Sequence, residues 1–217
     1  MDEEVIALGA EALITRIKLL SLDILVKRRI RKKYRIKALD IRLRRERTIR
    51  EARIITDCRK LGIPAPAIID VDVDRSVIWM EFIKGSKLKD KMNELTDNEI
   101  ARIAHSLGIY VGILHSNGIV HGDLTTSNII ITDNNQIYLI DFGLSAYSND
   151  IEDMGVDIHL FMRAIESTHY DKRKLILDNF MKGYTRIMGD KARTVFEKVR
   201  EIRSRGRYVK ERAIRSS

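Results

Sequence analysis

Apolar and polar residues alternate in short runs from Val5 to Val26, and this two-residue period predicts antiparallel strands. From about Ala38 to Leu61 the apolar residues recur at helical spacing, which predicts one long helix. Gly62 and two nearby prolines end that helix, because proline disfavours helical geometry in the residue before it. Two further strands come next, one of them at Val77–Met80. The first part of the chain is therefore predicted to be a small antiparallel sheet with one helix.

The rest of the chain is predicted to be mostly helical. A helix from Asn98 to Ser116 follows a capping sequence that begins at Thr96, and short strand-like runs cover residues 128–132 and 136–140. Three further helical segments lie near residues 151–165, 172–188 and 191–203. The pattern predicts an α+β fold of two lobes, with a small N-lobe at 1–83, a reduced helical C-lobe at 84–203 and a basic tail at 204–217.

Composition indicates which class of protein this chain belongs to and in which cellular compartment it is expected. The chain has 217 residues, 44% of them apolar and 33% charged, which is typical of a soluble globular protein. No stretch approaches the length of a membrane span, and the N-terminus is acidic where a secretory signal would be basic. The single cysteine, Cys58, excludes an intrachain disulfide. We expect a cytoplasmic protein with no membrane contact and an idle or buried thiol.

Positive charge is concentrated in two segments. Residues 27–60 carry a net charge of +12 and residues 193–217 carry +6, so the remainder carries −9 in a chain whose total is +9. Such runs are usually solvated helix faces or tails, but they also attract the phosphates of nucleic acids. Composition alone leaves both interpretations open.

The run from His121 to Asn128, followed by Asp141-Phe142-Gly143, carries the clearest chemistry. In kinase-type phosphoryl transfer, one Asp handles the proton of the attacking oxygen, and an Asn and a second Asp hold the magnesium ions on the phosphates of ATP. Asp123, Asn128 and Asp141 fit these three roles in order and in spacing. The alternative is that they only cap turns, as Asp, Asn and Gly often do; the joint occurrence of the motifs favours the catalytic interpretation.

A kinase also needs a strand lysine on the phosphates and a helix glutamate that holds the lysine. Lys27 follows three apolar strand residues, although it also opens a basic run and could be one solvated cation among many. Glu51 lies in the long predicted helix and is favoured as its partner over Glu46.

Two further segments are candidates for nucleotide contacts. No GxGxxG sequence occurs, so the small-residue turn Gly9-Ala10-Glu11-Ala12 is the available phosphate-binding turn, with backbone amides as donors. The sequence after Met80 resembles a hinge that bonds adenine through its backbone. Its predicted contacts are the carbonyl of Glu81 and the amide of Ile83.

Several features differ from ordinary protein kinases. Both prolines precede the Asp141 motif, which excludes an Ala-Pro-Glu segment, and only 74 residues follow Gly143. Gly122 stands where ordinary kinases carry the arginine that pairs with a phosphorylated activation loop. We expect no activation by loop phosphorylation and little room for a peptide-docking platform.

Together these residues resemble the small atypical kinase of the KEOPS (EKC) tRNA-modification complex, a relative of the RIO kinases, over essentially the full length. The matching segments are Gly9–Ala12, Glu51–Arg53, Gly62–Pro66, His121–Asn128 and Asp141–Leu144. The family's basic tail is matched in part by Arg205-Gly206-Arg207, with Tyr208 in place of a lysine. The resemblance indicates an archaeal source.

The resemblance implies a Ser/Thr-kinase-like protein that uses ATP and Mg²⁺, autophosphorylates weakly and acts mainly as an ATPase. Its implied partners are the metalloprotein that transfers threonylcarbamoyl to adenosine in tRNA, fused to the kinase in some archaea, a small regulatory KEOPS subunit on the N-lobe, and tRNA. Three alternatives stay open: an ATP-binding adaptor with an RNA-binding surface and little catalysis, a plain protein kinase, and a small-molecule kinase of the aminoglycoside phosphotransferase type. The last two usually need more chain than this sequence provides.

Overall fold

The structure is a computed structural model that describes the backbone of residues 3–215 and the side chains of residues 3–205. It contains two compact units, which we call the sheet unit (residues 3–85 and 132–143) and the helical unit (residues 86–131 and 144–215). No helix in the described part of the chain is both long and apolar enough to cross a bilayer.

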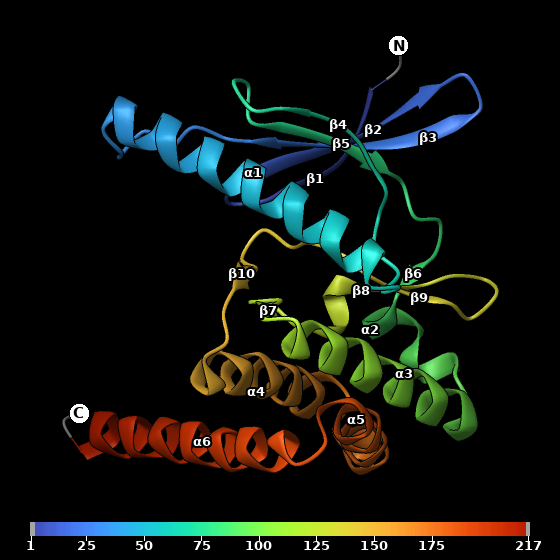
Figure 1. The fold of residues 1–217 in the computed structure, drawn as a ribbon, viewed down its shortest axis with the longest axis vertical. Helices are drawn as coiled ribbons and strands as arrows, with labels where there is room; N and C mark the ends of the chain where they lie inside the picture. Colours follow the sequence, from blue (N-terminus) through green and yellow to red (C-terminus); the bar gives the residue numbers. More distant parts are fainter. Residues whose placement is uncertain (1–2, 216–217) are drawn as a thin grey trace. The chain divides into compact units, whose positions relative to one another are not determined.

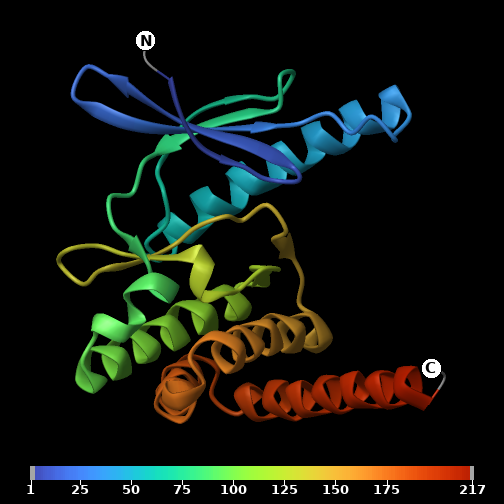
Figure 2. The same ribbon diagram turned by 180° about the vertical axis from the view of Figure 1, so that it is seen from behind.

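The sheet unit is a five-stranded antiparallel sheet with one long helix (Figures 1 and 2). In chain order its elements are β1 (Glu3–Leu8), β2 (Ala12–Leu19), β3 (Leu22–Arg29), α1 (Lys37–Lys60), β4 (Ile68–Asp72), β5 (Val77–Glu81) and the short β9 (Ile137–Leu139). The strand order in the sheet is β1-β2-β3-β5-β4, so β3 lies in the centre, between β2 and β5.

The alternation of β3 separates its side chains between two faces. Ile24 and Val26 are buried with Val77 of β5 in an apolar cluster. Helix α1 packs against β4 and β5 and buries Ile54 and Ile55. Because successive strand residues point to opposite faces, the same strand can supply both this cluster and the polar groups of a site.

Two backbone hydrogen bonds hold the segment after α1 in place. The Ile63 amide donates to the Cys58 carbonyl at 2.9 Å and closes the helix, as predicted from the glycine and prolines there. The Leu139 amide in β9 then donates to the Pro64 carbonyl at 3.0 Å. This second bond attaches residues 132–143 to the sheet unit, although they are distant in sequence.

The helical unit is built mainly from four helices. Its elements are β6 (Ser86–Lys87), α2 (Leu88–Lys91), η1 (Met92–Glu94), α3 (Asp97–Ser116), β7 (Ile119–Val120), η2 (Thr126–Asn128), β8 (Ile129–Ile131), β10 (Ala146–Tyr147), α4 (Ile151–Thr168), η3 (Tyr170–Lys172), α5 (Arg173–Met188) and α6 (Lys191–Arg215). Helix α3 begins with a capping box in which Thr96 and Glu99 each bond the backbone amide of the other, as the sequence predicted.

Helices α3 and α5 cross with their backbones in contact. A Cβ atom on Gly108 would lie 2.1 Å from the Phe180 carbonyl oxygen, and one on Gly183 would lie 2.0 Å from the His105 carbonyl oxygen. Only glycine fits at both positions. Beside the crossing, the rings of Phe161 and Phe180 pack at 4.8 Å between centroids and form the aromatic part of the core.

The predicted fold class is confirmed: an antiparallel sheet with one helix is followed by a mostly helical part. One predicted boundary is wrong, because α6 continues to Arg215 instead of ending near Arg203. Val195 and Val199 are buried along its first half, and Gly206, which we expected to belong to a tail, does not end the helix. The side chains of Arg207 and Tyr208 in the predicted tail lie outside the described residues.

Candidate active site

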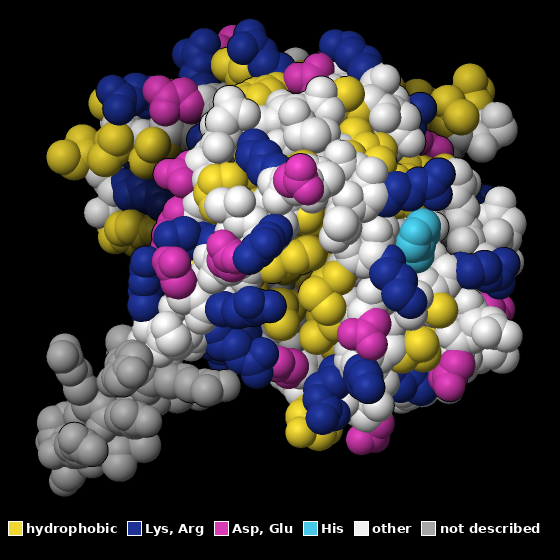
Figure 3. Space-filling view, turned by 60° about the horizontal axis from the view of Figure 1, so that its bottom comes forward, with side chains coloured by type: hydrophobic (Ala, Val, Ile, Leu, Met, Phe, Trp, Pro, Cys, Tyr) yellow, Lys and Arg dark blue, Asp and Glu magenta, His cyan; other side chains and the backbone are white. Residues whose placement is uncertain are grey.

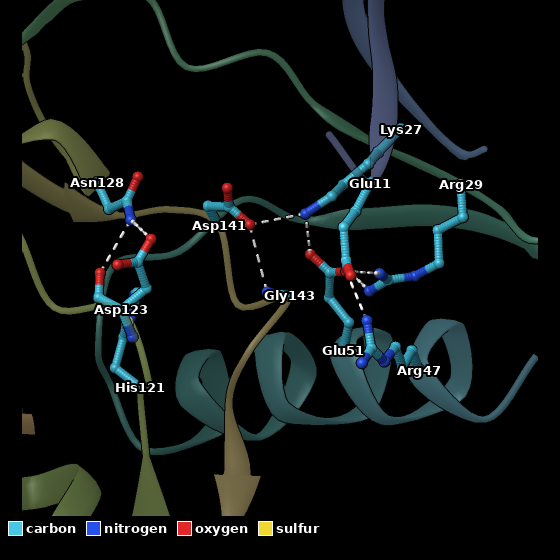
Figure 4. Close-up of polar contacts among 10 residues, drawn as sticks. All are labelled: Glu11, Lys27, Arg29, Arg47, Glu51, His121, Asp123, Asn128, Asp141 and Gly143. Carbon is cyan, nitrogen blue, oxygen red and sulfur yellow. Dashed lines mark hydrogen bonds and ion pairs between the residues drawn. The ribbon is translucent and has the colours of Figure 1, made fainter. Parts of the chain in front are cut away.

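Three of the predicted site residues meet in the sheet unit. Lys27 Nζ donates to Glu51 Oε1 at 2.6 Å and to Asp141 Oδ1 at 2.8 Å (Figure 4). These residues come from β3, α1 and the segment after β9, and 114 positions separate Lys27 from Asp141. Glu46, the alternative partner, is exposed and pairs with Arg42 at 3.3 Å. The structure therefore brings one lysine and two carboxylates together.

The Lys27 ammonium stays charged although it is buried. Burial alone would lower the pKa of Lys27, but the charges of Glu51 and Asp141 outweigh burial and raise that pKa above its usual value. The Lys27 side chain is 8% exposed and that of Glu51 is 1% exposed, whereas that of Asp141 is 45% exposed. Asp141 is thus the member of the group that solvent or a ligand can reach.

The sequence analysis missed Arg29, which is also buried and also binds Glu51. Its Nη2 donates to Glu51 Oε2 at 2.5 Å, so each oxygen of the carboxylate holds a different cation. The available signal was spacing, because Arg29 lies two residues after Lys27 on one strand and so points to the same face. It was hidden by the five other Lys and Arg residues between positions 27 and 33.

The predicted phosphate-binding turn connects β1 and β2. Its ends are joined by a hydrogen bond of 2.9 Å from the Gly9 amide to the Ala12 carbonyl, and Lys32 Nζ donates to the Ala10 carbonyl. Glu11 accepts from Arg47 Nη1 of α1 at 2.6 Å, and this hydrogen bond lowers the pKa of Glu11. The turn is therefore attached to α1 by charge.

The predicted hinge residues end β5. The Glu81 amide donates to the Ala67 carbonyl at 2.8 Å, and its carboxylate accepts from the Ala67 amide at 3.1 Å. The Phe82 amide then donates to the Asp23 carbonyl at 3.1 Å, and Ile83 is buried. These bonds fix the segment against the start of β3.

The helical unit contains the other pair of predicted catalytic residues. Asn128 Nδ2 donates to the Asp123 carbonyl at 2.9 Å and to Asp123 Oδ2 at 2.8 Å (Figure 4). Because the amide nitrogen of Asn128 faces Asp123, its carbonyl oxygen is directed elsewhere and can serve as a ligand. The Asp123 amide is 3.3 Å from His121 Nδ1, which accepts from it.

A buried aspartate that the sequence analysis did not identify anchors this loop. Asp157 of α4 accepts from the His121 amide at 2.6 Å and from the Gly122 amide at 2.8 Å. Gly122 has φ +79°, and a Cβ there would lie 2.2 Å from the Leu144 carbonyl oxygen. Glycine is therefore required at the position where ordinary kinases have arginine, and the absence of that arginine has a local structural cause.

Two more buried side chains, His115 and Tyr184, continue the hydrogen-bond network from Asp157. His115 Nε2 lies 3.3 Å from Asp157 Oδ2, and His115 Nδ1 lies 2.8 Å from the Tyr184 hydroxyl. Since an ionised carboxylate only accepts, Nε2 carries the proton and Nδ1 of a neutral ring accepts from Tyr184. Burial alone would raise the pKa of Asp157, but the hydrogen bonds from His115 and from the His121 amide outweigh burial and hold that pKa below its usual value.

The single cysteine takes no part in either group. Cys58 is fully buried in α1, and burial raises the pKa of its thiol to about 12. The thiolate that would be reactive is therefore absent at neutral pH.

Comparison with known proteins gives a consistent result. The model of the protein kinase domain matches residues 22–170. The KEOPS complex subunit Bud32 of Pyrococcus abyssi is 46% identical over 86% of this chain and 85% of its own length. A protein of Archaeoglobus fulgidus described as a probable serine/threonine-protein kinase BUD32 homolog is 40% identical over 93% of this chain and 95% of its own length.

Longer relatives also match. A protein of Methanocaldococcus jannaschii described as a probable bifunctional tRNA threonylcarbamoyladenosine biosynthesis protein is 41% identical over 96% of this chain. The match covers 38% of that relative, so this chain corresponds to one part of it.

Proposed function

Because the chain belongs to the Bud32 family of protein kinases, we propose that it is a magnesium-dependent ATPase and Ser/Thr kinase that supports threonylcarbamoyladenosine formation in tRNA as a KEOPS subunit. A protein kinase domain binds ATP, and the predicted kinase class is confirmed. The individual residue roles, the metal ion and the partners belong to the proposal.

The observation that carries the proposal is the contact of Lys27 with both Glu51 and Asp141. In this role Lys27 binds the phosphates of ATP and Glu51 holds Lys27. Asp123 orients the attacking hydroxyl or water and accepts its proton. The turn at Gly9–Ala12 contributes backbone donors to the phosphates, and Glu81 and Ile83 contribute backbone groups to adenine.

Asn128 and Asp141 are the residues that would hold Mg²⁺. Magnesium prefers oxygen ligands and needs only one or two from the protein, because water and phosphate oxygens complete its shell. The exposed carboxylate of Asp141 and the amide oxygen of Asn128 fit that requirement. The ion would supply charge neutralisation on the phosphates.

The names of the relatives suggest the partners. One relative is a KEOPS complex subunit, and others are bifunctional proteins of tRNA threonylcarbamoyladenosine biosynthesis. Together with the family resemblance, these names support our proposal that this chain binds the threonylcarbamoyl transferase, a small regulatory subunit on its N-lobe, and tRNA.

The two basic segments differ in how many of their cations are paired with carboxylates, and this difference decides which segment is the better candidate for RNA contact. In residues 193–205, four of the five cations pair with carboxylates, as Arg203 does with Glu166 at 2.9 Å. Figure 3 likewise shows basic and acidic side chains mixed on the face that it displays. Seven cations near and on α1 make no ion pair among the described residues, namely Arg31, Lys32, Lys33, Arg35, Lys37, Arg50 and Arg53. These are the better candidates for RNA phosphates.

The test is ATP turnover by the wild type and Asp123→Ala, with the transferase and tRNA present. We expect the variant to lose about 10²- to 10⁴-fold in rate, the usual contribution of a general base. Asp133→Ala, which removes an exposed aspartate from the turn before β9, is the matched control and should retain full activity. Equal rates for wild type and Asp123→Ala would refute the proposal.

An ATP-binding adaptor is the second candidate. The observation that favours it is the carboxylate of Glu11 in the predicted phosphate-binding turn. A carboxylate in a phosphate-binding turn opposes phosphate unless cations neutralise it. Asp141→Ala in a reconstituted modification assay separates the candidates, since an adaptor that needs no metal-dependent chemistry would still support tRNA modification. Loss of modification would eliminate the adaptor.

A further inference from the structure

Arg29 has no part in the roles assigned above, yet it occupies the centre of the charged group in the sheet unit. It lies two residues after Lys27 on β3, is 5% exposed, and binds the Glu51 oxygen that Lys27 does not use. Its Nη1 also lies 3.8 Å from Glu11 in the small-residue turn. Figure 4 shows Arg29 beside both carboxylates.

Arg29 therefore joins two parts of the proposed nucleotide site. Asp141 binds Lys27, Lys27 and Arg29 share Glu51, and Arg29 and Arg47 share Glu11. This series of ion pairs connects the segment after β9, the central strand, helix α1 and the turn between β1 and β2. The turn contains one glycine; a backbone hydrogen bond joins its ends, and the charges of Arg47 and Arg29 on Glu11 attach it to α1 and β3.

Fold stability alone does not explain a buried arginine here. Arg29 Nε is buried without a hydrogen-bond partner among the described residues, and an unsatisfied buried donor costs about 1 to 3 kcal/mol. Glu51 already has Lys27 as a counter-ion, so removing Arg29 leaves no uncompensated carboxylate. Removal of one member of a buried ion-pair group is costly when it leaves a charge unpaired, and here Glu51 keeps its pair with Lys27.

The charge of the group also suits an anionic ligand. Lys27 and Arg29 share Glu51, so these three buried side chains together carry one net positive charge. A lysine paired with its own glutamate alone would form a neutral pair. The shared carboxylate thus leaves positive potential at Lys27 for phosphate.

We propose that Arg29 is a positioning residue for the triphosphate. It holds the Glu51 carboxylate beside Lys27 and, through Glu11, attaches the Gly9–Ala12 turn to Glu51. This arrangement needs no phosphorylation of an activation loop. This inference rests on the proposed ATP-dependent function. It assigns Arg29 to phosphate binding and gives it no part in contacts to adenine.

The experiment compares the affinities of the full-length chain for ATP and for adenosine by calorimetry. In Arg29→Met we expect ATP to bind about tenfold more weakly, which corresponds to one charged hydrogen bond, while adenosine affinity stays within about twofold. Arg28→Met is the matched control. Arg28 is the next residue on β3, is exposed and pairs only loosely with Glu3 at 3.9 Å, so both affinities should be unchanged.

Two further measurements separate positioning from structural damage. The thermal midpoint of Arg29→Met should stay within a few degrees of the wild type or rise, and Arg29→Lys should recover part of the ATP affinity because it restores one donor to Glu51. Parallel loss of ATP and adenosine affinity, or ATP affinity equal to that of Arg28→Met, would overturn the inference. Failure of the wild type itself to bind ATP would instead refute the proposed function.

Discussion

The two units hold their candidate catalytic residues in different ways. In the sheet unit, long charged side chains from a strand, a helix and a turn meet one another, with Glu51 shared by Lys27 and Arg29. In the helical unit, one buried carboxylate, Asp157, accepts from two successive backbone amides. One group depends on the pairing of charges on flexible side chains, and the other on a rigid backbone turn.

This difference in how the residues are held predicts which unit tolerates amino-acid substitutions better. Long side chains can adjust their rotamers, and neighbouring cations can replace one another in part. Backbone amides cannot move without moving the loop that carries Asp123. We therefore expect substitutions around Asp157 to damage stability and turnover together, and substitutions in the ion pairs of the turn to alter nucleotide affinity with little effect on stability.

The largest effect is expected for Asp157→Asn. Asparagine keeps one acceptor but removes the charge that binds two amides and His115, and we expect a loss of about 3 kcal/mol in the free energy of unfolding, with turnover lost as well. Urea unfolding at neutral pH, followed by circular dichroism, measures the change. A matched substitution of an exposed aspartate, Asp171→Asn, should have no effect.

The same variant gives a pH test. The pKa of Asp157 lies below its usual 3.8 in the folded chain, so its stabilising contribution is fully present above about pH 3.8 and is lost as pH falls through the lowered value. The stability difference between wild type and Asp157→Asn should therefore be constant from about pH 8 to 5 and narrow below about pH 3.8. A difference that disappears already near neutral pH would contradict this assignment.

Gly122→Ala tests the backbone turn directly. A Cβ at 2.2 Å from the Leu144 carbonyl cannot be accommodated at φ +79°, so the loop must shift. Misplacement of a catalytic group by about 1 Å can lower turnover about a hundredfold, and we expect that loss with ATP affinity nearly unchanged. Steady-state ATPase kinetics measure it, and an active alanine variant would show that the loop is more adaptable than the structure indicates.

Tyr184→Phe should have a smaller effect in the same unit. It removes one buried hydrogen bond of 2.8 Å to His115 and should lower the free energy of unfolding by about 1 kcal/mol. Tyr170→Phe serves as a control because Tyr170 is 60% exposed. Equal unfolding curves for the two variants would mean that Tyr184 does not support His115.

The smallest effect is expected for Arg47→Met in the sheet unit. Its contact with Glu11 is partly exposed, and such pairs contribute little, so the KM for ATP should rise about threefold or less at unchanged kcat. Because Arg29 also lies near Glu11, a double substitution of Arg29 and Arg47 should exceed the sum of the single effects on ATP affinity. Simple additivity would indicate that the two arginines act separately.

Much of the fold was predictable because its signals are local. Alternation predicted β2 and β3, helical spacing predicted α1, and the Thr96 cap predicted the start of α3. The end of α6 was mispredicted because the basic residues around Gly206 were assigned to a tail, whereas this one glycine did not end the helix. The predicted catalytic residues were found from motif spacing, which is also local.

Residues that act through distant partners were not predictable. Asp157 looks like one more acid on a helix until the fold brings it to the His121 and Gly122 amides. Arg29 looks like one more cation until α1 places Glu51 against it. Neither partner is near in sequence, so neither relationship leaves a local pattern.

The sequence by itself determined the order of the strands and helices, the kinase-type motifs and the family, since these depend on periodicity and on spacing within short segments. Only the tertiary structure decided which of the many Lys and Arg residues are buried beside Glu51, and which acid anchors the Asp123 loop. The physical reason is that burial and pairing of charge depend on packing between segments far apart in the chain, where an ionised group is stable only if a particular partner meets it.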